Sequence, residues 1–492
     1  MAILNISQLV ERFEQNEPVS LSFYYPNENI SKTLNALLAK ILSKQDKIFL
    51  LDMMITILRE IIVNATKANA KRVYFKKINL NIDDPESYQK GIENFKKDIV
   101  GQLDTLEQDL KNNDLKVTLT IKKQDNGIRF SITNPTPIHP VELARIKTRI
   151  EKAKQYLDFT QAYEDVYDDT EGAGLGIVLV ILLLKNAGVD PSNYKIGTDG
   201  KITQVLLNLP YQLRPEKVIT EIQQQILEQI EGIPTFPDNI IQLLELCRRK
   251  DVEIKDITLS IMRDPALTTD VLKLANSAGF VPGKRIDNIS EAVMTIGLKN
   301  LESLLMTISA RKILDERFQK FEQIWDHCDK TASYARTIAI QYKMSTIVEQ
   351  VSLCGLLHDL GKIVLLSVNL ELTNWIADLV SDRKIRTSTV MEEISIGISH
   401  SEIGQLIAQK WQLPQYLIEA IQWHHSPLSC NSTYKDHVAV TYLANLFCGV
   451  ESRKYFHYYC EDEICRQFKI ETEDAFNKLH KLCMDTYNKI AQ

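Results

Sequence analysis

The chain has 492 residues, of which 44% are apolar and 25% are charged. This composition is typical of a folded protein, and the length predicts two or three domains rather than one core. The net charge of -6 excludes the basic composition typical of nucleic-acid-binding proteins, and no block of Lys and Arg suggests a local nucleic-acid site.

The sequence predicts a cytoplasmic protein without a membrane anchor. Residues 1–18 are amphipathic and acidic, unlike a signal peptide. The longest apolar run, residues 175–184, is shorter than the roughly 20 residues that span a bilayer, so we expect a buried helix or strand there. All eight cysteines lie from Cys247 onward and are expected to be reduced thiols.

Residues 1–213 are predicted to mix helices and strands. We expect a helix over residues 55–70, a strand over residues 73–77 and another strand over residues 205–209. Between the first two strands, the charged segment 87–111 has apolar residues at spacings of three and four, which predicts an amphipathic helix. This helix either packs on its own sheet or forms the contact of a homodimer.

A β-hairpin is the clearest local prediction in this half. Residues 115–122 alternate between apolar and polar side chains, and the alternation resumes over residues 128–132. Asp125, Asn126 and Gly127 between them form a strong turn signal.

The second half is predicted to be helical throughout. Residues 214–231 are expected to form a linker helix, and residues 232–492 read as successive helices without a convincing strand. The predicted fold class is therefore α+β, an N-terminal α/β sandwich followed by an all-α bundle.

Histidines are concentrated in the predicted bundle, since His139 is the only one of nine that precedes His327. His358 is followed directly by Asp359, and we expect Gly361 to end their helix. Such a dyad offers one nitrogen and one oxygen to a divalent ion, which suits activation of water for phosphate-ester hydrolysis.

Several segments of the second half resemble the HDOD domain, a relative of the HD metal-dependent phosphohydrolases. They follow in the order of that family: IPTFPDNIIQLLEL, RDPALTTDVLKLANSA, ISEAVMTIGLKNL, SLCGLLHDLGKIVLL, ISHSEIGQLIAQKWQLP and AIQWHHSP. The resemblance covers residues 232–427 and predicts an HDOD domain over residues 232–430. Residues 431–492 would then be a C-terminal helical extension.

The resemblance implies six candidate metal ligands: His327, His358, Asp359, His400, His424 and His425. The last three match metal-binding positions of HD-GYP phosphodiesterases, although the Gly-Tyr-Pro signature is absent. The final aspartate of the HD ligand set is replaced by Asn445, whose neutral amide is a poorer ligand for a hard cation.

Three interpretations of these histidines stay open. They could be hydrogen-bonded remnants of an ancestral site, ligands of an ion bound without turnover, or the centre of a working phosphodiesterase. Iron, manganese and zinc are the candidate ions. HDOD domains are usually regarded as non-catalytic signalling modules, so the resemblance favours a regulator that acts on a partner protein.

The first half carries a second resemblance, to the GHKL ATPase fold of histidine kinases and gyrase. Residues 170–176, TEGAGLG, place a glycine-rich turn before an apolar segment, where helix amides can bind phosphate. The segment LREIIVNATKANAKR resembles the magnesium-binding helix of that fold. The resemblance implies candidate sites for ATP and Mg²⁺ at Glu60, Asn64, Lys67, Gly172, Gly174 and Gly176.

The adenine-binding loop departs from the GHKL pattern. Thr133 stands where an aspartate would accept a hydrogen bond from adenine, and Pro135 and Pro137 replace two glycines. The degenerate loop favours a scaffold without nucleotide turnover. An ATPase or a kinase acting on another protein, through Glu60 and Asn64, is the alternative.

A histidine kinase phosphorylates itself on a histidine in a helix that precedes the ATPase domain. Residues 1–138 contain no histidine, so autophosphorylation of this kind is excluded within this chain. The leading interpretation is a non-catalytic signalling protein that couples an HDOD module to a degenerate ATPase-like domain.

Overall fold

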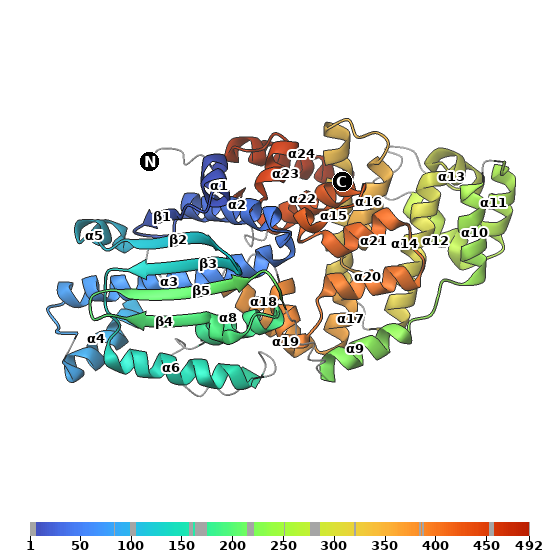
Figure 1. The fold of residues 1–492 in the computed structure, drawn as a ribbon. Coiled ribbons are helices and arrows are strands. Elements are labelled where there is room, and N and C mark those ends of the chain that lie inside the picture. Colours follow the sequence, from blue (N-terminus) through green and yellow to red (C-terminus); the bar gives the residue numbers. More distant parts are fainter. Residues whose placement is uncertain are drawn as a thin grey trace. The chain divides into compact units, whose positions relative to one another are not determined.

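A computed structural model describes residues 6–82, 84–98, 105–156, 161–162, 175–213, 221–249, 251–275, 286–318, 321–382, 385, 388–451 and 457–491. The chain forms two compact units (Figure 1). The N-terminal unit comprises Met1–Thr220 and Glu393–Gly397, and the helical unit comprises Glu221–Glu392 and Ile398–Gln492.

The N-terminal unit contains a five-stranded antiparallel sheet in the order β1-β2-β3-β5-β4. Its strands are β1 (Val19–Phe23), β2 (Val117–Gln124), β3 (Gly127–Asn134), β4 (Tyr194–Thr198) and β5 (Thr203–Pro210). The predicted hairpin is confirmed as β2 and β3, with Gln124 opposite Gly127. The sequence patterns did not identify β1 and β4.

Helices of this unit lie behind the sheet and beyond its edges in the view of Figure 1. They are α1 (Ile6–Glu14), α2 (Glu28–Lys44), α3 (Leu51–Lys77), α4 (Pro85–Asp98), α5 (Glu107–Asn112), α6 (Pro140–Gln155) and α8 (Leu175–Asn186). Helix α3 packs against β2 and β3, and α8 packs against α3 and α6. The apolar run 175–184, for which we expected a buried helix or a buried strand, forms a buried helix.

The strand predicted over residues 73–77 is wrong, because these residues are the last turns of α3. Val73, Tyr74 and Phe75 favour strands by local propensity, yet all three are buried. Packing against neighbouring helices outweighs that weak local preference.

The single helix predicted over residues 87–111 is also corrected, since this segment contributes to two helices, α4 and α5, and residues 99–104 lie outside the described residues. Its aromatic side chains pack on a helix rather than on the sheet. The rings of Phe95 and Tyr74 are 5.6 Å apart, and those of Tyr88 and Phe75 are 6.1 Å apart. A homodimer contact stays a prediction.

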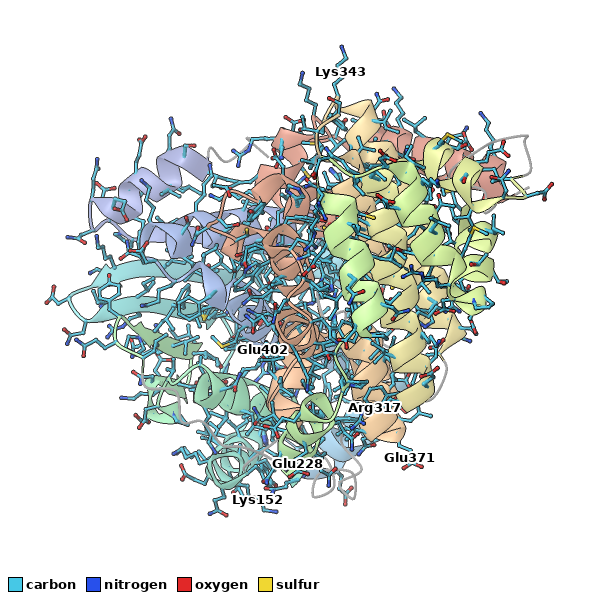
Figure 2. The ribbon with its side chains drawn as sticks, turned by 90° about the vertical axis from the view of Figure 1, so that its right-hand side faces the viewer. Lys152, Glu228, Arg317, Lys343, Glu371 and Glu402 are labelled. Atoms are coloured by element: carbon cyan, nitrogen blue, oxygen red, sulfur yellow. The ribbon has the colours of Figure 1, made fainter. Side chains whose placement is uncertain are left out.

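The helical unit has no strand among its described residues. Its helices are α9 (Glu221–Glu231), α10 (Asp238–Arg248), α11 (Ile254–Met262), α12 (Pro265–Ala275), α13 (Ile289–Ile296), α14 (Leu298–Arg317), α15 (Glu322–Gln341), α16 (Val348–Leu357), α17 (Leu360–Val368), α18 (Leu370–Asp382), α19 (Thr389–Ile396, of which residues 389–392 belong to this unit), α20 (His400–Lys410), α21 (Gln415–Trp423), α22 (Lys435–Glu451), α23 (Asp462–Gln467) and α24 (Glu473–Ala491). Charged side chains such as Lys343 and Glu371 lie on its surface (Figure 2).

One stretch of the described residues, Val348–Val368, is long and apolar enough to cross a membrane by length and composition. It spans α16 and α17, and 67% of its 18-residue apolar segment is buried inside the structure. A core helix of a folded domain passes the same test, so this stretch is weak evidence for a membrane span.

The C-terminal helices belong to the core of the helical unit. Helices α22 and α24 pack against α15, and Phe476 and Leu479 are buried. Leu482 of the same helix, α24, is 39% exposed. All eight cysteines are buried free thiols.

Candidate metal centre

The ends of four helices, together with one residue inside α15, bring the six predicted ligands together. Their positions are as follows: His327 within α15, His358 at the C-cap of α16, Asp359 at the N-cap of α17, His400 at the first position of α20, and His424 and His425 directly after α21. Gly361 does not end the helix of the dyad, because α16 ends before His358 and Gly361 lies inside α17.

Gly361 has a different role, which is to let α17 approach α20. A Cβ atom added at Gly361 would lie 1.9 Å from the carbonyl oxygen of His400 and 2.7 Å from the backbone nitrogen of Gly404. Gly355 allows α16 the same closeness to α15, since its Cβ would lie 2.6 Å from the Cα of Ala332. Both contacts are with backbone atoms, so only glycine fits without displacing the helices that carry the ligands.

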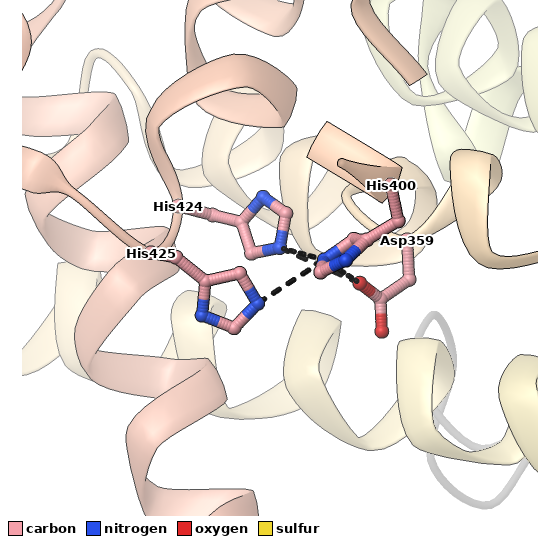
Figure 3. Close-up of side chains that lie close together, drawn as sticks. All are labelled: Asp359, His400, His424 and His425. Carbon is pink, nitrogen blue, oxygen red and sulfur yellow. Dashed lines mark hydrogen bonds and ion pairs between the residues drawn. The ribbon is translucent and has the colours of Figure 1, made fainter. Parts of the chain in front are cut away.

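Four side chains converge on one point (Figure 3). His400 Nε2 lies 3.3 Å from His424 Nε2 and 3.1 Å from His425 Nε2. Asp359 Oδ1 lies 3.5 Å from His400 Nε2 and 3.4 Å from His424 Nε2. Two ligands that are each about 2.0–2.1 Å from one ion are about 3.0–3.4 Å apart, so this spacing suits a shared cation.

The other oxygen of Asp359 faces a second group. Asp359 Oδ2 lies 3.6 Å from His327 Nε2 and 3.4 Å from His358 Nε2, so these three residues could also hold a metal ion. The ammonium of Lys362 lies only 2.8 Å from the same oxygen. Asp359 thus joins two neighbouring groups, and Lys362 already supplies a positive charge to one of them.

Hydrogen bonds fix the orientation of three imidazoles. His358 Nδ1 donates to the carbonyl oxygen of Gly355 at 2.8 Å, and His424 Nδ1 donates to that of Ile421 at 2.7 Å. His400 Nδ1 donates to the carboxylate of Glu392 at 2.7 Å. Because a carbonyl or carboxylate oxygen only accepts, each neutral ring carries its proton on Nδ1 and turns the lone pair of Nε2 toward the centre.

This arrangement fits a bound cation. The lone pairs of His400 Nε2 and His424 Nε2 face each other at 3.3 Å, which is unfavourable unless a positive charge lies between them. His358 Nε2 and Asp359 Oδ1 are buried, and neither makes a hydrogen bond of good geometry with any described residue. Unsatisfied buried polar atoms are rare in folded proteins. An ion among the four converging side chains would satisfy Asp359 Oδ1, whereas His358 Nε2 faces the second group.

Burial also keeps the histidines ready to bind metal. It lowers the pKa of His358 and His425 well below the usual value, and it lowers the pKa of His424 to a smaller degree. Burial alone would raise the pKa of Asp359, but its interactions with the neighbouring His358 side chain and with the ammonium of Lys362 hold it well below its usual range. Neutral imidazoles and an ionised carboxylate are the forms that bind a metal.

Asn445 lies where the HD resemblance placed the missing aspartate. It comes from α22, is buried, and its side chain hydrogen-bonds to the imidazole of His327. The side chain of His327 is 31% exposed, so this edge of the centre is open to solvent. The substitution therefore removes a negative charge from the group formed by His327, His358 and Asp359.

Two residues of the centre, Lys362 and Glu392, were not predicted from the sequence. Lys362 follows Asp359 by three positions in one helix, so helical spacing could have indicated it. Glu392 lies on α19, and no local pattern links it to His400. Only the packing of α19 beside the start of α20 reveals it.

The structure does not show that the candidate ATP- and Mg²⁺-binding residues of the N-terminal unit form one pocket. On α3, Glu60 is buried, Lys67 is partly buried and Asn64 is exposed. Gly176 lies inside α8, whereas Gly172 and Gly174 are outside the described residues.

The loop that contains Pro135 and Pro137 is held by hydrogen bonds. Thr136 Oγ1 donates to Asn69 Oδ1 at 3.0 Å, and Thr203 Oγ1 donates to the carbonyl oxygen of Thr136 at 2.6 Å. Thr133, at the end of β3, is partly exposed. The loop is therefore tied to α3 and β5 by the protein itself.

A helical bundle with a His-Asp dyad at its centre is the pattern expected of an HD-type domain. Residues 233–427 match the model of the HDOD domain. The chain therefore contains an HDOD domain, as the sequence motifs predicted. A GHKL fold in the N-terminal unit stays a prediction.

Known proteins match about half of the chain and, in one case, most of it. A protein of Treponema pallidum (strain Nichols) described as uncharacterized is 28% identical over 444 residues, which cover 90% of this chain and 86% of the relative. An HDOD domain protein of unknown function from Geobacter sulfurreducens is 23% identical and covers 55% of this chain and 95% of its own, with a TM-score of 0.44. A structure from Shewanella amazonensis SB2B, described as a candidate phosphohydrolase, is 22% identical, covers 54% of this chain and 98% of its own, and has a TM-score of 0.43.

Proposed function

We propose that this protein is a signalling regulator whose HDOD domain binds one divalent metal ion without catalytic turnover. The observation that carries the proposal is the four-ligand cluster of Asp359, His400, His424 and His425, whose ligand atoms lie within 4.8 Å of one another. Imidazole lone pairs directed at a common point repel one another unless a cation lies between them. This favours a bound ion over hydrogen-bonded remnants of a lost site. Iron, manganese and zinc suit this mixture of imidazole and carboxylate ligands.

The charge of the centre favours a single ion. Asp359 and Glu392 are its buried carboxylates, and the ammonium of Lys362 already neutralises one of them. A second divalent ion beside His327 would have to share Asp359 Oδ2 with the ammonium of Lys362. The neutral amide of Asn445 would add no negative charge to balance that ion. Uncompensated buried charge is costly, so we expect the three-residue group to stay without metal.

Elemental analysis of the purified full chain tests this proposal. We expect one iron, manganese or zinc ion per chain, which a His424→Ala variant loses. His457→Ala is the matched control, because His457 lies in the same unit and hydrogen-bonds to the carbonyl oxygen of Ile470. Metal at 100 times its dissociation constant should stabilise the fold by about 2.7 kcal/mol. A chain that takes up none of these ions, and whose melting temperature they do not change, would contradict the proposal.

Metal-dependent phosphoester hydrolysis is the second candidate function. The partial exposure of His327 and Lys362, at 31% and 30%, favours it, since a phosphate anion could approach a cation there. The experiment compares hydrolysis of bis-p-nitrophenyl phosphate and of a cyclic dinucleotide by the manganese-loaded protein and its Asn445→Asp variant. Turnover by the unmodified protein would overturn the non-catalytic assignment, and turnover by the variant alone would show that the missing charge silences the site.

The regulatory role would be exerted on a partner protein in the cytoplasm, with neither nucleic acid nor membrane as its target. The acidic net charge of -6 supports the absence of a nucleic-acid target. Formation of a homodimer belongs to the same proposal and can be tested by the molar mass of the protein in solution.

The N-terminal unit would be a degenerate GHKL-type domain. Its sheet supports this assignment, and so do the positions of Glu60 and Lys67 on α3, seven residues apart on one helix. ATP with Mg²⁺ is the candidate ligand. A melting temperature that does not change at millimolar ATP and Mg²⁺ would contradict nucleotide binding.

A further inference from the structure

We infer that Glu392 is a positioning residue that orients the metal ligand His400 and strengthens its bond to the ion. The inference rests on the proposed metal site and adds a residue to it. Glu392 belongs to α19 and is 3% exposed. It is not one of the four residues whose ligand atoms lie close together.

The carboxylate of Glu392 holds His400 at two points. Its Oε2 lies 2.7 Å from His400 Nδ1 and accepts the backbone N–H of His400 at 2.8 Å, while Oε1 lies 3.0 Å from the same Nδ1. Both the ring and the backbone of His400 are therefore fixed by one buried side chain. Because His400 is the first residue of α20, the negative charge also lies at the positive end of that helix.

His400 differs in this respect from two other ligands of the centre. The Nδ1 atoms of His358 and His424 donate to the carbonyl oxygens of the residues three positions earlier, Gly355 and Ile421. Those partners are neutral and come from the same helical turn. His400 starts its helix and has no preceding turn, so its partner must come from another helix.

A charged acceptor has a chemical consequence that a carbonyl does not have. A carboxylate that accepts from Nδ1 fixes the proton there and increases electron density at Nε2, which makes the imidazole a stronger metal ligand. His400 Nε2 lies within 3.5 Å of Asp359 Oδ1 and within 3.3 Å of His424 Nε2. Its orientation therefore decides whether the four ligand atoms can meet at one ion.

Titration of the metal-free full chain with Co²⁺ tests the inference, because its visible spectrum reports both affinity and ligand geometry. We expect Glu392→Gln to raise the dissociation constant about 10–100-fold and to shift the visible bands. Glu392→Asp keeps the charge and should lie between this variant and the unmodified protein. The matched control is Glu402→Gln, since Glu402 caps the same helix end through Ser399 but does not contact a ligand ring.

The outcomes separate this inference from the proposed function. If the unmodified protein does not bind Co²⁺, the metal site itself is refuted. If it binds Co²⁺ and Glu392→Gln shows the same affinity and spectrum, the positioning role is refuted. Should Glu392→Gln fail to fold, nitrogen NMR of the zinc-loaded unmodified protein decides: His400 protonated on Nδ1 supports the role, and protonation on Nε2 overturns it.

Discussion

At the scale of single residues, Asp359 organises the centre, because its two oxygens serve different groups. Oδ1 faces His400 and His424, and Oδ2 is within 2.8 Å of Lys362 Nζ. A buried carboxylate is stable only with compensating charge. In the absence of metal, Lys362 provides that compensation, which explains how the site can stay folded before an ion arrives.

The buried histidines should make the metal-free protein sensitive to mild acid. Burial lowers the pKa of His358 and His425 well below 6.5, so the unfolded chain takes up protons before the folded one does. Their contribution to stability is complete above pH 6.5 and is lost as the pH falls. Each such histidine contributes a slope of up to about 1.4 kcal/mol per pH unit. Urea denaturation between pH 8 and pH 5, with a chelator present, measures this slope.

A comparison with His425→Gln isolates the histidine contribution. Asp329, whose pKa burial raises to about 6, acts in the opposite direction over part of the same range. Both proteins contain Asp329, so its effect cancels in the comparison. The variant should show a shallower loss of stability below pH 6.5, and parallel curves for the two proteins would refute this prediction.

At the scale of elements, glycine allows the helices to approach closely enough for the ligands to meet. Helix α17 carries Asp359 at its start and crosses α20 at Gly361, where the backbone of His400 is in contact. Interiors are packed too densely to absorb an extra carbon between two backbones. The glycine that follows the dyad is thus a condition for the geometry of the site.

Gly361→Ala should therefore destabilise the helical unit and weaken metal binding together. We expect a loss of roughly 1–3 kcal/mol or more in the free energy of unfolding, because the new Cβ would overlap backbone atoms. Urea denaturation and metal titration measure the two effects. Gly197→Ala on β4 is the control, since nothing lies within 4 Å of its added Cβ. Equal stability of the two variants would show that α17 and α20 can separate at little cost.

At the scale of the whole molecule, the folding unit extends beyond the family match. The match ends at residue 427, yet α22 follows it and is buried over His437–Gly449. Helix α22 packs against α15, α16 and α21, and it also supplies Asn445. The segment predicted as an extension is thus part of the core.

Removal of residues 431–492 should therefore prevent cooperative folding of the helical unit. The truncated chain would expose apolar faces of α15 and α16, including Ala335, Ile338 and Val351, which are fully buried in the intact protein. Calorimetry and limited proteolysis of the truncated and complete chains provide the test. A sharp unfolding transition of the helical unit in the truncated chain, with metal still bound, would contradict this expectation.

Features that depend only on the local order of residues could be predicted from the sequence. The β2–β3 hairpin follows from the alternation along each strand and from the turn signal between the two strands. The His358–Asp359 dyad is visible because its residues are adjacent and their motif resembles a known family.

Features that depend on contacts between distant segments could be read only from the packed structure. Residues 73–77 became helix because packing outweighs a small local preference for strands. Glu392 reaches His400, and Lys362 competes for Asp359, only once helices have packed. Local patterns carry no information on such distances, because the direction in which a side chain points is fixed by the elements that surround it.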